Sequence, residues 1–335
     1  MSVHQNVSRR NALKIITSAV GMSLLPGAVG RSSATIPSVH WRGIVMNAPA
    51  QLHLYGIDRT HGQRSIRRAI LEARRLEAIF SLYRPDSAVR RLNQNGRIAA
   101  PPPELVELLN EACAISVVTD GAFDVTMQPL WQLYAMHFAQ VPEVSEGPPA
   151  DELARVSELI DYRFLTISSD EISFARKGMA VSLNGIVQGY VTDRVTDLLR
   201  AEGFANMTVD FGEARMTGTR PDGAPWGVAI QDPTVEGKML DSLSLSDGAV
   251  ATSQPAGTIF EPTGRHHHLF DPRTGRSVNY YRSVTVQAAN ATRADGLSTG
   301  LSILPPERLR AVSRSFADVR AVVLKADGLW LDSLS

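Results

Sequence analysis

A run of three histidines, residues 266–268, is the segment of this sequence best suited to moving protons. The imidazole ring titrates near neutral pH and can act as a general base. The run leads into residues 271–275, Asp-Pro-Arg-Thr-Gly, where proline and glycine predict an abrupt turn. A histidine run alone is more often a polar surface or an adventitious metal binder. The segment is therefore a candidate site that needs support from elsewhere in the chain.

Asp295 and Thr299 form a second candidate site. If a helix begins near Asp295, the two side chains lie at i and i+4 on one of its faces. A carboxylate and a hydroxyl placed in this way could both reach a hard cation such as Mg²⁺, which prefers oxygen ligands. The commoner interpretation of this spacing is a helix cap beside a solvated face. The pair alone indicates a metal site without establishing one.

Two glycine-containing segments could present backbone groups to a phosphate. Residues 182–190, SLNGIVQGY, are typical of a strand that turns into a helix, whose N-terminal amides favour anions. This segment is neither a dinucleotide-binding G-x-G-x-x-G motif nor a P-loop, and a tight turn into a core helix is the commoner interpretation. Residues 210–213, DFGE, are as often a turn as a site. Asp193 and Arg194, further along the helix, are expected on its solvated face.

The composition is that of an ordinary globular protein. The chain has 335 residues, 44% hydrophobic and 20% charged, and its 34 basic and 34 acidic residues give a formal net charge of zero. This balance gives no support to a nucleic-acid partner or to a polybasic membrane surface. Cys113 is the only cysteine, which excludes an intrachain disulfide and a site held by several cysteines of one chain.

Residues 1–34 are predicted to be a twin-arginine signal peptide, which leaves residues 35–335 as the domain of the mature protein. Arg9 and Arg10 precede an apolar run over residues 15–25, which is too short to cross a bilayer comfortably. A proline ends the run and small residues follow, as a signal peptidase requires. No cysteine follows the run, so we expect a periplasmic protein without a stable membrane anchor. The alternative is an amphipathic N-terminal helix.

The elements that must position the candidate residues are helices mixed with hairpins. Apolar residues at three- and four-residue spacing predict helices over residues 63–83, 104–118, 187–199, 294–303 and 307–316. Short apolar or alternating segments predict strands over residues 42–55 (a pair), 164–174 (a hairpin), 179–183, 206–211, 226–231, 249–252, 267–270, 283–287, 321–325 and 329–331. Residues 141–150 are predicted to be an exposed loop. This mixture predicts an α+β fold, with mixed, largely antiparallel sheets and packed helices in a single compact domain.

Eight segments occur in an order that resembles the FAD:protein FMN transferase, or ApbE, family. They are FSLYRPDSAVRRLNQNG, GAFDVTMQPLWQLY, SLNGIVQGYVTDRV, VDFGE, PWGVAIQDP, GAVATS, HHLFDPRTG and ADGLSTGLSIL. Singly, only HHLFDPRTG and GAFDVT are moderately specific. The ordered set, which covers residues 42–304, is highly specific.

The resemblance implies an enzyme that binds FAD and splits its pyrophosphate with the help of Mg²⁺. FMN would then be joined through a phosphoester to a threonine or serine of a target flavoprotein with an FMN-binding domain, and AMP would be released. A hydroxyl is a poor nucleophile near pH 7, so a histidine base agrees with this chemistry. The alternatives are a protein that only binds or donates FAD, and an FAD pyrophosphatase in which water replaces the hydroxyl.

The resemblance also implies roles for individual positions. His268, immediately before Leu-Phe-Asp-Pro, matches the catalytic histidine, and His267 is the alternative if the alignment of the histidine run shifts by one. A metal ion would be held by the Gly185 carbonyl, the Asp295 carboxylate and the Thr299 hydroxyl. FAD would contact Met46, Tyr83, Ala122, Phe123, Asp124, Ser182 and Gln188.

The sequence departs from the family pattern in three places. Ser182 and Gln188 stand where Asp and Lys are usual, so one charge of each sign is lost. Residues 210–213 replace a more common Gly-Gly-Asp or Gly-Gly-Asn ending, and residues 253–257 lack the usual Gly-Asp-Tyr-Glu. These departures affect residues that would bind FAD and its phosphates, so they bear on the affinity for FAD. The pattern is similar to that of the NosX-like subgroup associated with nitrous oxide reduction, and this resemblance implies a target that is a membrane regulator with a periplasmic FMN-binding domain.

Overall fold

The computed structural model describes residues 13–16, 37–140, 146–235, 238–328 and 330–332. Their centre is an eight-stranded sheet with the strand order β16-β15-β14-β11-β8-β7-β3-β2. Each neighbouring pair in this sheet is antiparallel. The strands are β2 (Ser38–Val45), β3 (Ala48–Tyr55), β7 (Asn206–Asp210), β8 (Ala214–Thr217), β11 (Gly248–Ser253), β14 (Tyr281–Ala288), β15 (Arg320–Lys325) and β16 (Trp330–Asp332).

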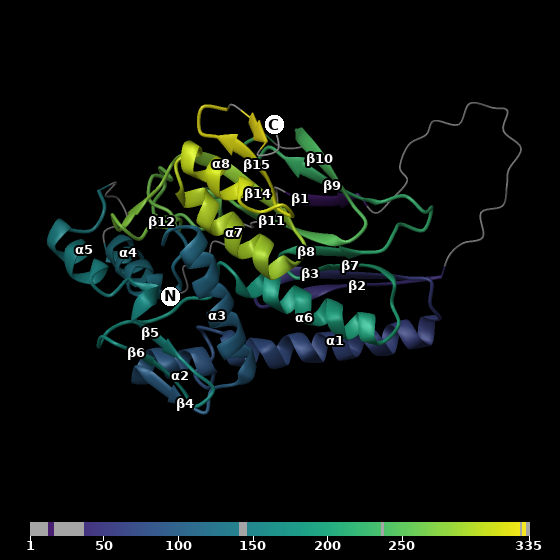
Figure 1. Ribbon diagram of the computed structural model, residues 1–335, viewed down its shortest axis with the longest axis horizontal. Coiled ribbons are helices and arrows are strands. Elements are labelled where there is room, and N and C mark those ends of the chain that lie inside the picture. The colour runs from purple at the N-terminus through teal and green to yellow at the C-terminus, as the bar shows by residue number, and fades with distance from the viewer. Residues whose placement is uncertain (1–12, 17–36, 141–145, 236–237, 329, 333–335) are drawn as a thin grey trace, which may run out of the picture.

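Three smaller sheets accompany the central sheet within the described residues. The first packs on one face of the central sheet, where Trp226 and Met216 are fully buried in a shared apolar cluster. The other two lie at the end of the molecule where α4 (Gln128–Gln140) and α5 (Ala150–Ser157) are labelled in Figure 1. The strands are β1 (Leu13–Ile16), β9 (Trp226–Gln231) and β10 (Met239–Leu245) in the first sheet, β4 (Arg97–Ala99), β6 (Glu171–Phe174) and β5 (Leu165–Ile167) in the second, and β12 (Phe270–Asp271) and β13 (Arg276–Ser277) in the third.

Helices cover the opposite face of the central sheet (Figure 1). Alternation along β11 shows the two faces: Ala249 and Ala251 belong to the core beneath the helices, whereas Val250 belongs to the cluster beneath the small sheet. Long helices α1, α6 and α7 form this layer, and α3 packs on α7. The helices are α1 (Arg59–Phe80), α2 (Ala88–Asn95), α3 (Pro103–Val118), α4 (Gln128–Gln140), α5 (Ala150–Ser157), α6 (Val187–Ala201), α7 (Ala291–Ile303) and α8 (Pro306–Arg314).

Helices α6 and α7 approach each other backbone to backbone at Gly189. A Cβ atom built on Gly189 would lie 2.2 Å from the carbonyl oxygen of Ala291, so a larger residue would push the helices apart. This contact brings two segments with predicted site residues together, because α7 carries Asp295 and Thr299 and the segment that leads into α6 carries Gly185.

The predicted α+β class, with largely antiparallel sheets and packed helices, is confirmed. Helix α1 begins at Arg59, before the predicted residue 63, because Asp58 caps it by accepting hydrogen bonds from Thr60 N and His61 N. Strands β8 and β10 lie in segments for which no strand was predicted.

Two strand predictions were wrong. Residues 179–183 join no sheet; instead Ser182 N donates to Val125 O, and the Asn93 side chain pairs with the backbone of Val181. Within residues 267–270, Phe270 alone belongs to a strand, β12, and His267 makes an isolated bridge to Ile259. The backbone N–H and C=O groups of these segments are hydrogen-bonded to loops and side chains instead of to a neighbouring strand. An apolar sequence pattern is the same in both cases, so it does not distinguish them.

The expectation that Asp193 lies on a solvated helix face was also wrong, because Asp193 is 7% exposed and faces α7. The predicted signal peptide lies outside the described residues except for β1, which pairs with β9. Of the predicted loop 141–150, residues 141–145 lie outside them too, and Ala150 begins α5. Among the described residues, no helix has both the length and the apolar character needed to cross a membrane.

Candidate active site

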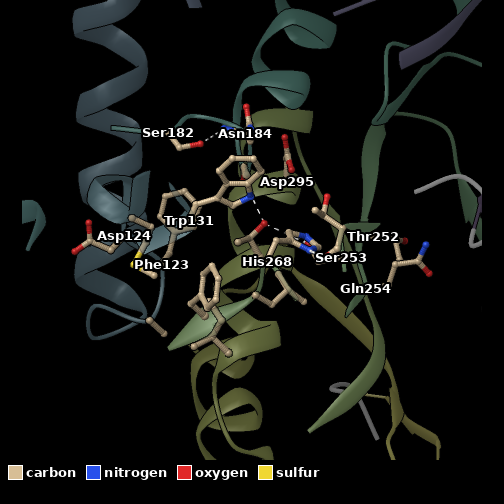
Figure 2. Close-up of a pocket in the computed structure, with 18 of the residues that line it drawn as sticks. Phe123, Asp124, Trp131, Ser182, Asn184, Thr252, Ser253, Gln254, His268 and Asp295 are labelled. Carbon is tan, nitrogen blue, oxygen red and sulfur yellow. Dashed lines mark hydrogen bonds between the residues drawn. The ribbon is translucent and has the colours of Figure 1, made fainter. Parts of the chain in front are cut away.

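A pocket is built from segments that are far apart in the sequence (Figure 2). Parts of residues 122–131, 182–185, 252–258 and 268–270 line it together with helix α7. The predicted site residues that line it are Tyr83, Ala122, Phe123, Asp124, Ser182, Gly185, His268, Asp295 and Thr299. The fold therefore gathers most of the predicted site around one space.

Asp295 and Thr299 lie on one face of α7, as their spacing predicts. Thr299 Oγ1 lies 3.4 Å from the carbonyl oxygen of Gly185 and 3.2 Å from Ser253 Oγ. Asp295 is 2% exposed, and its Oδ2 accepts a hydrogen bond from Gly189 N at 3.0 Å. This end of the pocket is therefore lined by oxygen atoms from a carboxylate, two hydroxyls and a carbonyl.

The oxygen set fits Mg²⁺, because hard cations prefer carboxylate, hydroxyl and carbonyl ligands. A Cβ atom on Gly185 would lie 3.1 Å from Thr299 Oγ1, so the absence of a side chain lets this backbone come close to the hydroxyl. The described part of the chain has no group of three or more histidine, cysteine, aspartate or glutamate side chains that could hold a metal ion. A cation here would depend on neutral oxygens beside Asp295.

His268 faces the pocket from the segment before β12 (Figure 2). Its Nδ1 lies 3.2 Å from the carbonyl oxygen of Thr258, and its backbone N donates to the same oxygen at 3.0 Å. A carbonyl oxygen can only accept, so this contact places the proton on Nδ1 and makes Nε2 the basic nitrogen. The loop thus fixes the orientation of the ring and leaves Nε2 as the nitrogen without the proton.

His267 is fully buried and is not among the residues that line the pocket. Leu269 N donates to its Nδ1 at 3.3 Å, and its Nε2 lies 3.2 Å from Asn279 Oδ1. Burial lowers the pKa of His267, and both of its ring nitrogens have hydrogen-bond partners. Of the two histidines left open by the sequence, His268 is therefore the one with access to the pocket.

Asp124 holds the wall of the pocket together through its carboxylate. Oδ1 accepts hydrogen bonds from the backbone N and the Oγ1 of Thr126 at 2.7 and 2.6 Å, and Oδ2 accepts one from Tyr162 N at 2.8 Å. Burial raises the pKa of Asp124, although these hydrogen bonds oppose the shift. The carboxylate ties two short 3₁₀ helices, Val125–Met127 and Tyr162–Phe164, to each other beside the pocket.

Aromatic side chains form much of the remaining wall. Phe123 and Trp131 line the pocket, and Tyr83, with 63% of its surface exposed, lies where the pocket meets solvent. Flat apolar surfaces of this kind suit a planar aromatic ligand.

The structure does not bring Met46 and Gln188 to the pocket lining. Met46 lies in the turn between β2 and β3 with a φ angle of 49°, and its side chain packs against the main core. The Gln188 amide packs on Gly212, where an added Cβ would lie 2.6 Å from Gln188 Cδ. Their contact with FAD stays a prediction.

Several pocket residues were not predicted from the sequence. Glu213, 4% exposed, contributes a buried carboxylate, and Ser253 Oγ lies 2.8 Å from Ser298 Oγ as well as near Thr299. The sequence places Glu213 in a segment, residues 210–213, that is as often a turn as a site, and no local signal showed where its side chain points. The further unpredicted lining residues are Met127, Trp131, Asn184, Thr252, Gln254, Thr258, Leu269, Phe270 and Ile303.

The central antiparallel sheet lies between a helical layer and a small sheet, and a histidine and several oxygen atoms line one pocket; this arrangement defines the class as an α+β protein with a polar pocket. The sequence model described as the ApbE family matches residues 46–323, and the chain belongs to this family.

Two relatives illustrate the similarity. The chain is 34% identical over 254 residues to an FAD:protein FMN transferase of Vibrio cholerae, covering 74% of this chain and 75% of the relative. It is 31% identical over 250 residues to the FAD:protein FMN transferase of Haemophilus influenzae, covering 71% and 72%.

Solved structures agree with this placement. The flavin transferase ApbE from Vibrio cholerae superposes with a TM-score of 0.74 at 29% identity, covering 89% of this chain and 96% of that one. The apo form of the Pseudomonas stutzeri flavinyl transferase ApbE also gives a TM-score of 0.74, at 27% identity, covering 89% and 94%.

Proposed function

We propose that this protein is an FAD:protein FMN transferase, which moves FMN from FAD to a threonine or serine hydroxyl of a target flavoprotein and releases AMP. The observation that carries the proposal is that one pocket brings together His268, Asp295 and Thr299, with the Gly185 carbonyl beside Thr299. The names of the relatives at 34% and 31% identity support the same reaction.

The chemistry follows from the pocket. The target hydroxyl oxygen attacks the FMN phosphorus of the FAD pyrophosphate, and the bond between that phosphorus and the bridging oxygen breaks. The electron pair stays with the AMP phosphate, and the hydroxyl proton passes to His268 Nε2. His268 is suited to this task because the Thr258 carbonyl fixes its tautomer.

Gly185, Asp295 and Thr299 would hold Mg²⁺ in this scheme. When bound, Mg²⁺ would neutralise charge on the pyrophosphate and on the departing AMP. The hydrogen bond from Gly189 N orients the Asp295 carboxylate. Phe123 and Trp131 would pack against the flavin ring of FAD.

Export and target identity form the finer part of the proposal. The Arg9-Arg10 pair and the apolar run over residues 15–25 support export through the twin-arginine pathway to the periplasm. The similarity to NosX-like proteins supports a target in nitrous oxide reduction, either a regulator or an electron-transfer protein with an FMN-binding domain.

The test is to incubate the purified protein with FAD, Mg²⁺ and a candidate FMN-binding domain. A fluorescent target whose mass has increased by one FMN phosphoester, together with an equal amount of AMP, is the expected result. Free FMN and AMP with an unmodified target would indicate an FAD pyrophosphatase. Unchanged FAD would indicate a binding or donor protein, and either result would contradict the proposal.

A further inference from the structure

We propose that Asp193 and Arg215 are positioning residues for the metal-binding face of α7. The inference rests on the proposed function, because it concerns the cation site at Asp295 and Thr299. Neither residue lines the pocket. Both act through the start of α7, which they hold in place relative to α6 and the central sheet.

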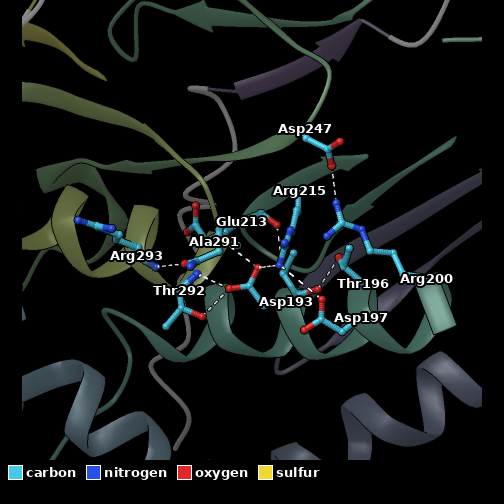
Figure 3. A network of polar contacts seen from close by, with 12 residues as sticks. Asp193, Thr196, Asp197, Arg200, Glu213, Arg215, Asp247, Ala291, Thr292 and Arg293 are labelled. Carbon is cyan, nitrogen blue, oxygen red and sulfur yellow. Dashed lines mark hydrogen bonds and ion pairs between the residues drawn. The ribbon is translucent and has the colours of Figure 1, made fainter. Parts of the chain in front are cut away.

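Asp193 satisfies the N-terminus of α7 from a neighbouring helix (Figure 3). Its Oδ1 accepts a hydrogen bond from Ala291 N at 2.9 Å, and its Oδ2 accepts bonds from the N and Oγ1 of Thr292 at 2.8 and 2.6 Å. Amides in the first turn of a helix have no acceptor within the helix, and they favour a negative charge. The Asp193 carboxylate, which belongs to α6, therefore accepts hydrogen bonds that a capping residue of α7 itself would otherwise accept.

The rest of the cap is local to α7. Asn290 is the N-cap residue, and its Oδ1 accepts a hydrogen bond from Arg293 N at 2.9 Å. Ala294 N donates to the Asn290 carbonyl at 3.2 Å. The first four amides of α7 are thus divided between Asn290 and Asp193. Asp193 holds the two nearest the helix start, so it sets where α7 begins.

Arg215 forms an ion pair with Asp193 and connects it to the central sheet. Arg215 Nη1, on β8, lies 2.5 Å from Asp193 Oδ1, and the two side chains are 11% and 10% exposed. A buried charge is tolerated when it is paired and hydrogen-bonded. Asp197 lies further away, at 3.9 Å from the same nitrogen, and its side chain is 55% exposed.

Each of the two helices α6 and α7 supplies an aspartate that accepts a backbone hydrogen bond from the other helix. This pair of contacts connects Asp193 to the proposed cation site. One turn before Asp193 on α6, Gly189 N donates to Asp295 Oδ2 at 3.0 Å. One turn after Ala291 on α7, Asp295 receives that bond. A shift at the start of α7 would therefore move Asp295 and Thr299 relative to the Gly185 carbonyl. Residues that orient metal ligands typically change metal affinity by about 10- to 100-fold when they are replaced.

The experiment measures Mg²⁺ binding directly, by calorimetry on the purified full chain with Mg²⁺ alone. Asp193→Asn keeps the shape of the side chain but turns an NH₂ group toward a backbone donor. We expect its Mg²⁺ affinity to fall by about 10- to 100-fold. FMN transfer should recover toward the wild-type rate as Mg²⁺ is raised. The matched control, Asp197→Asn on the same helix, should bind Mg²⁺ as the wild type does.

A second variant covers the case in which Asp193→Asn does not fold, as judged by circular dichroism. Thr292→Val removes the hydroxyl donor and keeps the backbone amide, and it should weaken Mg²⁺ binding by a smaller but measurable factor. Folded Asp193→Asn with wild-type Mg²⁺ affinity would overturn the inference, as would an unaffected Thr292→Val if Asp193→Asn is unfolded. In both cases an active wild-type enzyme leaves the proposed function standing. Wild-type protein that neither binds Mg²⁺ nor transfers FMN would overturn both.

Discussion

Thr299 Oγ1 lies 3.4 Å from the carbonyl oxygen of Gly185, although 114 residues separate the two in the chain. The fold creates this proximity by packing α7 against the segment that leads into α6. Asp295, one turn before Thr299 on α7, adds a carboxylate to the same end of the pocket. His268 lines this pocket from a different loop, so an imidazole ring and several oxygen atoms meet around one space.

Asp295→Ala should lower FMN transfer by orders of magnitude, because the variant loses the charged group of the proposed cation site. Raising Mg²⁺ should restore part of the rate. The change also leaves the buried Gly189 N–H without its acceptor, which costs about 1–3 kcal/mol of stability. The measurement is the transfer rate as a function of Mg²⁺, below the unfolding temperature of the variant. Wild-type transfer at limiting Mg²⁺ would show that the site is misassigned.

His268→Ala should lower FMN transfer by roughly 10²–10⁴-fold and leave FAD affinity largely unchanged, because a general base acts on the nucleophile. The rate is followed as covalent FMN fluorescence on the target, and FAD affinity by fluorescence quenching.

His267→Ala is the matched control for this prediction. It removes a buried ring and its hydrogen bonds, so we expect about 1–3 kcal/mol of lost stability but normal transfer per folded molecule. Loss of transfer in His267→Ala with normal transfer in His268→Ala would reverse the two assignments.

His53 should make the protein less stable as the pH falls from 6.5 toward 4. Burial, followed by the charges of His40 and Arg42, lowers the pKa of His53 from 6.5 to about 4. His40 Nδ1 and His53 Nδ1 are 3.0 Å apart across the β2–β3 ladder. The unfolded chain binds the proton at higher pH than the folded chain does. The stability that the protein gains from a neutral His53 is therefore fully present above pH 6.5 and is lost as the pH falls through 4.

The expected size of this effect is roughly 2–3 kcal/mol, allowing for partial solvent screening. Urea unfolding at pH 7 and pH 4.5 measures it, and His53→Gln should reduce the difference between the two free energies. His137→Gln, on α4, is the control and should leave the difference unchanged. An equal pH difference in His53→Gln and wild type would contradict the assignment.

Replacing both Arg9 and Arg10 by lysine should leave uncleaved precursor in the cytoplasm, because the twin-arginine receptor reads the guanidinium pair. Cell fractionation followed by immunoblotting measures the distribution. Arg31→Lys, beyond the apolar run, should be exported normally. Periplasmic accumulation of the double variant at the wild-type level would remove the support for this export route.

Features that depend on neighbouring residues could be predicted from the sequence. Val187, Val191 and Val195 recur at helical spacing, and they are buried along α6. Asp295 and Thr299 share a face of α7 for the same reason, since the backbone geometry of a helix fixes which side chains lie together. The order of the family motifs also indicated the class of reaction, which the spacing of residues alone does not indicate.

Only the tertiary structure decided which side chains face each other across the fold. His267 and His268 are adjacent and chemically identical, yet one is packed beside Asn279 and the other faces the pocket. Asp193 looks like a solvated helix residue until α7 is placed against it, and its partner Thr292 lies 99 residues away. The burial and hydrogen bonds of such groups depend on segments that no local window includes. Chain packing therefore determines their environment, and with it their protonation and their role.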